Sequence, residues 1–143
     1  MIASQLYSFP ARMESLAPAL EHLKAASSGT EPGAALRAET ALEELLTNSV
    51  VHGGAGSVAQ ASIWLGVSVG GDALKLRYED ACPAFDPFPA IELALEHTRN
   101  PMEQRPIGGL GLLMVYRLAD EFRYGRENGR NCIDLSFLGR RIS

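Results

Sequence analysis

Cysteine and long apolar runs are scarce in this 143-residue chain. The two cysteines, Cys82 and Cys132, lie far apart, and the three histidines share no ligand spacing with them. We therefore expect no structural zinc site and a reduced, cytoplasmic protein. No apolar run approaches the ~20 residues of a membrane helix, and residues 1–12 lack the charged start and apolar core of a secretory signal. We therefore expect no membrane contact.

An excess of positive charge is also missing, because the formal net charge is −4. Proteins that bind nucleic acid directly carry a basic stripe or patch, so we expect no such contact. The remaining composition, 46% hydrophobic and 21% charged, is that of a soluble globular protein. The length predicts one domain over residues 1–143. Glycine is moderately frequent, with 14 residues.

Hydrophobic periodicity predicts the secondary structure. Apolar residues recur at helical spacing in residues 13–26, 32–52, 90–97 and 110–118, with Thr30 as a possible N-cap of the second helix. Apolar and polar residues alternate, as in strands, at 6–9, 61–69, 74–79, 122–124 and 133–137, and Gly70-Gly71-Asp72 and Asn128-Gly129 are hairpin signals. We expect an α+β two-layer sandwich, with a mixed, mostly antiparallel sheet and about three helices on one face.

Three polar residues form a stripe along the long helix. Glu44, Asn48 and His52 are spaced by four, and each step of four advances 40° around a helix. The carboxylate and the carboxamide suit a hard cation that phosphate oxygens also hold, and the carboxylate also suits a general base. The alternative is an ordinary solvated helix face.

Asp80 continues the apolar alternation of its strand, so its side chain is expected to point toward the covered face of the sheet. A carboxylate is costly there unless it is paired. It either caps the next segment or accepts a hydrogen bond from a ligand. Cys82, two residues later, is either a reactive thiol or a small buried residue. Ser49 and Ser57 have no His/Asp pairing visible in the sequence, so a catalytic triad is not supported.

A glycine-rich segment, residues 105–112, precedes the fourth helix. Glycines let backbone N–H groups approach an anion, and the helix N-terminus adds partial positive charge. The segment lacks the Gly-Lys-Ser/Thr of a Walker A loop, and a proline-broken loop stands where the Rossmann fingerprint needs a strand.

Together the three motifs resemble the ATP-binding (Bergerat) fold shared by DNA gyrase, histidine kinases and MutL, over about residues 4–138. Within it the chain is similar to the stand-alone anti-sigma-factor serine kinases. The N box is matched by Glu44-Leu45-Leu46-Thr47-Asn48, with His52 one turn later. The G1 box is matched by Asp80-Ala81-Cys82-Pro83-Ala84-Phe85-Asp86-Pro87, and the G2 box by Arg105-Pro106-Ile107-Gly108-Gly109-Leu110-Gly111-Leu112.

The resemblance implies a role for each motif. Glu44 would be the general base, Asn48 would coordinate Mg²⁺ on the ATP phosphates, and Asp80 would accept the adenine amino hydrogen bond. Arg105 would offset γ-phosphate charge, and residues 89–107 would form a lid. The further ATP-binding residues that it implies are His52, Cys82, Phe85, Gly108, Gly109, Leu110, Gly111 and Leu112.

The implied activity is that of a Mg-ATP-dependent serine/threonine protein kinase that is also an anti-sigma factor. It would sequester a sigma factor and phosphorylate an anti-anti-sigma antagonist of the STAS type, and it would form a homodimer. Cys82 departs from the pattern, because this box usually has glycine there, and Cys82→Gly is expected to tighten ATP binding. The alternatives are a regulatory module that binds ATP or a partner without catalysis, and an α+β domain with an unrelated ligand.

Overall fold

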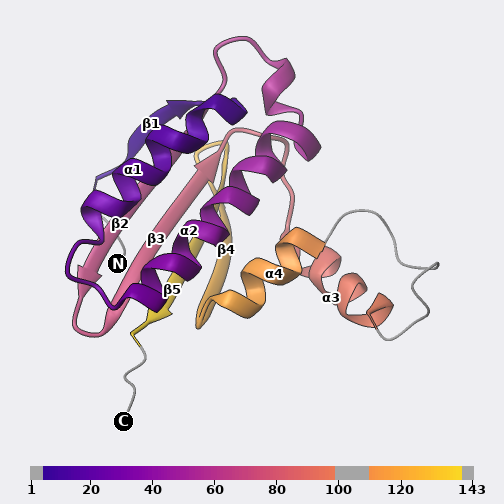
Figure 1. Ribbon diagram of the computed structural model, residues 1–143. Helices are drawn as coiled ribbons and strands as arrows, with labels where there is room; N and C mark the ends of the chain where they lie inside the picture. The colour runs from indigo at the N-terminus through magenta and orange to yellow at the C-terminus, as the bar shows by residue number, and fades with distance from the viewer. Residues whose placement is uncertain (1–4, 99–109, 140–143) are drawn as a thin grey trace.

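The computed structural model describes residues 5–98 and 110–139, which form a five-stranded sheet with helices on one side (Figure 1). The strand order is β1-β2-β3-β5-β4, and the four strand pairs in this part of the chain are all antiparallel. The predicted α+β sandwich is confirmed. The strands are β1 (Tyr7–Pro10), β2 (Ser62–Gly70), β3 (Ala73–Asp80), β4 (Glu121–Glu127) and β5 (Arg130–Leu138).

Both predicted hairpins form. Gly71, between β2 and β3, has φ +59°, while Asn128 and Gly129, between β4 and β5, have φ 52° and 75°. In the β4–β5 turn, positive φ at both central residues is the signature of the type I′ turn, which matches the twist of the flanking strands, whereas the β2–β3 turn has positive φ at Gly71 alone. The β3–β5 pairing then joins the hairpins into one sheet and sets Asp80 opposite Asn131.

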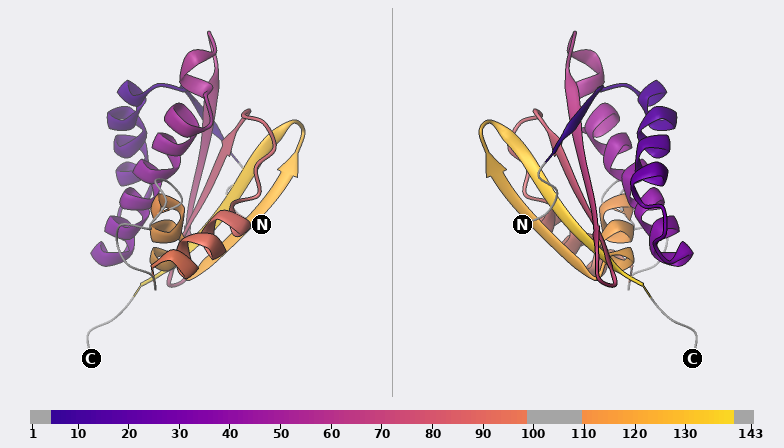
Figure 2. Two further views of the ribbon diagram at one scale, coloured as in Figure 1. Left: turned by 90° about the vertical axis from the view of Figure 1, so that its right-hand side faces the viewer. Right: turned by 90° about the vertical axis from the view of Figure 1, so that its left-hand side faces the viewer.

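The described residues contain four α-helices, α1 (Leu16–Ala26), α2 (Pro32–Thr47), α3 (Pro87–His97) and α4 (Leu110–Leu118). Figure 2 shows the helices on one side of the sheet, whereas no helix of this part of the chain covers the opposite face. The core between the layers is built from α2 leucines such as Leu42 and Leu46 and from sheet residues such as Leu76 and Phe137, all fully buried. None of these helices combines the length and apolarity needed to cross a membrane.

α2 begins at Pro32 as predicted, but its predicted cap is wrong, and so is the predicted start of α3. Thr30 does not cap α2, because the Glu31 carboxylate accepts the backbone N–H of Ala34 at 2.6 Å, and the Thr30 hydroxyl has no hydrogen-bond partner within the described residues. α3 begins at Pro87 rather than at residue 90. Pro87 is the first residue of this helix, where proline is favoured because its missing N–H costs nothing.

The long helix also ends differently from the prediction. α2 ends at Thr47, and Asn48–His52 form a π-helical turn, η2. The backbone N–H of Gly53 closes this turn on the carbonyl of Asn48 at 2.6 Å. Gly54, with φ +77°, then ends the segment. Single π turns inside helices are rare and frequent at functional sites.

Candidate functional site

A cavity of about 490 Å³ lies between the helical layer and the β3 and β5 ends of the sheet. Its wall is largely apolar, with a few polar side chains. That combination is typical of small-molecule sites. The lining residues are Leu45, Asn48, Ser49, His52, Gly53, Tyr78, Asp80, Cys82, Pro83, Ala84, Phe85, Pro87, Ala90, Leu93, Ala94, Leu112, Asn131 and Ile133.

Asp80 lines this cavity from the end of β3, on the covered face of the sheet as predicted. Its carboxylate accepts three hydrogen bonds, from Ser49 Oγ at 2.6 Å, from Asn131 Nδ2 at 2.9 Å and from the Cys82 backbone N–H at 3.2 Å. The hydrogen bond from the Cys82 backbone is the capping contact with the next segment, one of the two roles that the sequence allows for Asp80. The carboxylate is therefore paired within the protein and also faces the cavity.

Ser49 connects Asp80 to a buried tyrosine. Tyr78 Oη lies 2.7 Å from Ser49 Oγ, and burial, followed by the nearby charge of Asp80, raises the pKa of the Tyr78 phenol far above its usual value. Because the Ser49 hydroxyl has one proton and donates it to the carboxylate, the phenol donates to Ser49. Ser49 does contact an aspartate, which the sequence did not reveal, but it is buried as part of a hydrogen-bond chain.

Asn131 holds the loop that follows β3. Its Nδ2 donates to Asp80 and also to the carbonyls of Cys82, at 3.3 Å, and Pro83, at 3.0 Å. Its Oδ1 accepts from the Phe85 backbone N–H at 3.1 Å and from Tyr124 Oη at 2.7 Å. Arg126 on β4 donates to the same Cys82 carbonyl at 2.8 Å. The cavity wall from Cys82 to Phe85 is thus fastened to the β4–β5 hairpin.

Cys82 is a small buried residue, 7% exposed, as one of the two interpretations predicted. Its thiol lies 3.7 Å from the carbonyl oxygen of Ser49, and a Cβ added to Gly53 would lie 2.8 Å from its sulfur. Burial, with the charge of Asp80, raises the pKa of Cys82 to about 11. The residue does not adopt positive φ, so its backbone needs no glycine.

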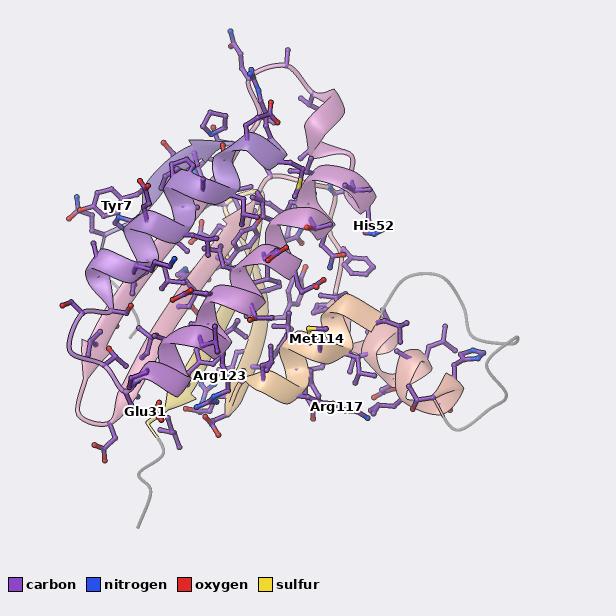
Figure 3. All side chains as sticks on the ribbon, viewed as in Figure 1. Tyr7, Glu31, His52, Met114, Arg117 and Arg123 are labelled. Carbon is purple, nitrogen blue, oxygen red and sulfur yellow. The ribbon has the colours of Figure 1, made fainter. Side chains whose placement is uncertain are left out.

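Two members of the helix stripe, Asn48 and His52, line the cavity, and Figure 3 places His52 at the opposite end of this helix from Glu31. The side chains of Glu44 and Asn48 make no hydrogen bond or ion pair with residues 5–98 or 110–139. The same ranges contain no cluster of three His, Cys, Asp or Glu able to hold a metal ion. A cation at Asn48 would therefore need oxygen ligands from a bound molecule as well.

Glu44 lies outside the cavity lining, against the start of α4. A Cβ added to Gly111 would lie 2.5 Å from Glu44 Oε2, so this glycine makes room for the carboxylate. Leu112 lines the cavity, whereas Leu110 is 43% exposed and does not. The other predicted site residues of this motif, Arg105, Gly108 and Gly109, lie outside the described residues.

Sequence reasoning missed Ser49, Tyr78 and Asn131 as cavity residues. Asn131 carried a usable signal, because it continues inward the alternation of Ile133, Leu135 and Phe137, just as Asp80 continues that of β3. A polar residue at an inward position on each of two strands indicates a polar end of the core. Ser49 carried no such signal beyond its place on the leucine side of the helix.

Comparison with known proteins identifies the family. The model of the histidine kinase-like ATPase domain matches residues 9–137. No curated protein matches the chain. The structure of the RsbU and RsbW domains of Rv1364c from Mycobacterium tuberculosis is similar, with a TM-score of 0.57 and 16% identity over 96% of this chain. This chain spans 34% of that one.

A second similar structure is the histidine kinase domain of the Escherichia coli osmosensor EnvZ, with a TM-score of 0.46, 15% identity, and coverage of 100% of this chain and 93% of that one. At 16% identity the structure from Mycobacterium tuberculosis bears on the fold alone, whereas the family model matches nearly the whole chain. The chain belongs to the histidine kinase-like ATPase domain family, within the gyrase–histidine kinase–MutL group.

Proposed function

We propose that this chain is a Mg-ATP-dependent serine/threonine protein kinase that acts as an anti-sigma factor. In this proposal it sequesters a sigma factor and phosphorylates a STAS-type anti-anti-sigma protein, and it works as a homodimer in the cytoplasm. The family supports an ATP site. The three boxes quoted above support the ATP site, and the narrower assignment follows the similarity of the whole chain to the stand-alone anti-sigma kinases.

One observation carries the nucleotide assignment. A single cavity of about 490 Å³ joins an inward carboxylate, Asp80, to the carboxamide Asn48 on the helix end. Most of the wall between them is apolar, which suits a planar base. We assign the base to the Asp80 end, because a fixed carboxylate accepts an amino N–H. We assign the phosphates to the end near Asn48 and the α4 N-terminus, whose backbone N–H groups favour anions.

Magnesium fits the residues at the phosphate end. Asn48 offers an oxygen that no described residue occupies, and a hard cation prefers such oxygen ligands. With only one protein ligand in view, the remaining ligands would be phosphate oxygens and water, which is common for magnesium at nucleotide sites. When bound, the ion would neutralise charge on the transferred phosphoryl group.

Glu44 is our general base. Its side chain lies one helical turn before Asn48 and against Gly111 at the start of α4, outside the cavity lining, and no described residue engages its carboxylate. It is therefore available to accept the proton of an attacking serine or threonine hydroxyl. Phosphoryl transfer depends mostly on positioning and electrostatics, so this base is expected to orient the hydroxyl as well. His52, Phe85 and Leu112 would line the nucleotide.

The test incubates the purified protein with γ-labelled ATP, magnesium and candidate STAS-type proteins, followed by phosphosite mapping. The proposal expects label on one serine or threonine of the antagonist and a loss of at least about 10²-fold in rate for Glu44→Gln. Thr40→Ala is the matched control on the same helix, because within residues 5–98 and 110–139 its hydroxyl bonds only to the Leu36 carbonyl, at 3.0 Å. ATP binding without transfer would favour the non-catalytic module. Transfer that is unchanged in Glu44→Gln would refute the assignment of the base.

A further inference from the structure

We propose that Ser49 and Asn131 are positioning residues that hold the Asp80 carboxylate in one orientation and so set the preference of the cavity for a base with an amino group. This inference rests on the proposed nucleotide site. It concerns two residues to which none of the three boxes assigns a role. They come from different elements, η2 and β5, and meet on one carboxylate.

The count of acceptor sites supports the proposal. An ionised carboxylate has about four lone-pair sites. Asn131 Nδ2 and the Cys82 backbone N–H occupy two of them on Asp80 Oδ1, and Ser49 Oγ occupies one on Oδ2. Among the residues that the structure describes, these three donors leave one acceptor site, on Oδ2. A ligand in the cavity therefore finds a carboxylate with room for one further N–H donor.

The geometry also fixes the plane of the carboxylate. The terminal torsion of an aspartate is broad, so a free Asp80 would sample many orientations. The donors on its two oxygens come from different elements and restrict this torsion. Because no rotation is then lost when a ligand binds, the hydrogen bond to the ligand is pre-organised.

The orientation of the Asn131 amide is determined by its surroundings. The Nδ2 side faces three acceptors, namely Asp80 Oδ1 and the carbonyls of Cys82 and Pro83, while Oδ1 faces two donors, Phe85 N–H and Tyr124 Oη. A flipped amide would set oxygen against oxygen at each of the three acceptors. The residue is 7% exposed, so water offers little replacement. Tyr78 and Tyr124 are the two ends of this network, and each member between them is held by hydrogen bonds to its neighbours, which makes the network rigid.

The test uses two variants that each remove one donor from Asp80. Ser49→Ala deletes the hydroxyl. Asn131→Asp keeps an oxygen for Tyr124 and Phe85 but replaces the donor to Asp80 by a second carboxylate oxygen. Calorimetry would compare their affinities for ATP and for purine ribonucleoside triphosphate, which lacks the 6-amino group.

The expected result is a preference for ATP of about tenfold in the wild type, because a hydrogen bond to a charged group is worth about that factor. The preference should shrink to about threefold or less in each variant and stay unchanged in Thr40→Ala. A purely structural role would weaken both nucleotides alike and leave the ratio unchanged, and that outcome overturns the proposal.

A second measurement needs no nucleotide. Amide hydrogen exchange at Cys82, whose N–H donates to Asp80, should accelerate about tenfold or more in both variants and stay at the wild-type rate in Thr40→Ala. Unchanged exchange in both variants overturns the proposal even where ATP binds. If the wild type binds neither nucleotide, the proposed function fails, and the exchange rates alone decide whether Ser49 and Asn131 position Asp80.

Discussion

Replacing Gly111 by alanine should slow phosphoryl transfer without lowering the stability of the fold. The added Cβ would lie 2.5 Å from Glu44 Oε2, and ordinary contact begins near 3.4 Å, so the carboxylate has to retreat by about 0.9 Å. Glu44 sits at the end of a flexible side chain, and its movement costs little folding free energy. Alanine in the first turn of α4 gains up to about 1 kcal/mol over glycine. The variant should therefore be as stable as the wild type or more so.

Catalysis should respond in the opposite direction. A misplacement of about 1 Å in a reacting group costs roughly 10²-fold in rate. We therefore expect the rate of phosphoryl transfer in Gly111→Ala to fall by roughly 10²-fold, while ATP affinity stays within a few fold. Single-turnover transfer of label from γ-labelled ATP measures the rate, and calorimetry and thermal unfolding measure the affinity and the stability.

The control is Gly125→Ala on β4, where a Cβ would meet nothing within 4 Å. This variant should leave the transfer rate unchanged. A transfer rate within about twofold of the wild type in Gly111→Ala would refute the placement of the catalytic base against α4. A fall in the melting temperature of Gly111→Ala by more than a few degrees would show that backbone, and not only the Glu44 side chain, had to move.

Three further changes test the packing around the site. Cys82→Gly was expected from its motif to tighten ATP binding, but the thiol packs against Gly53 and the Ser49 carbonyl, so we now predict a loss of stability of about 1 kcal/mol and no gain in affinity by calorimetry. Alkylation of Cys82, followed by mass spectrometry, should keep accelerating about tenfold per pH unit up to pH 11, because its pKa is raised to about 11, whereas an ordinary thiol reaches its plateau near pH 9. Arg37→Ala should lower the free energy of unfolding by roughly 2–3 kcal/mol in urea, because its guanidinium donates to the carbonyls of Leu118 and Leu138 and to Asp120; Arg37→Lys should recover less than half of this loss. Unchanged stability in Arg37→Ala would contradict the Arg37 contacts. A plateau of the alkylation rate near pH 9 would contradict the burial of the Cys82 thiol.

The sequence predicted the elements and their layers because local patterns decide them. Alternation in β2 and β3 reports a sheet with one covered face, and Asn128-Gly129 specifies its turn through positive φ. The inward direction of Asp80 followed from the same alternation. The cap of α2 was predicted wrongly although its start was right, since Glu31 and not Thr30 supplies the capping oxygen.

The contacts around Asp80 could not be predicted in this way. They depend on the β3–β5 pairing, which brings Asp80 opposite Asn131 although the two residues are 51 positions apart in the chain. No local pattern specifies such a register. The π turn at Asn48–His52 is equally invisible to a 3.6-residue periodicity, and its Ser49 reaches Asp80 only because α2 packs over the end of β3.

The most direct test of the nucleotide site is a calorimetric titration of the wild type and of Asp80→Asn with ATP in the presence of magnesium. We predict one ATP bound per chain by the wild type. Asp80→Asn should weaken binding by at least about tenfold, because it removes the charged acceptor that faces the cavity. Absence of binding by the wild type, or equal affinities for the two proteins, would contradict the assignment of this cavity to ATP.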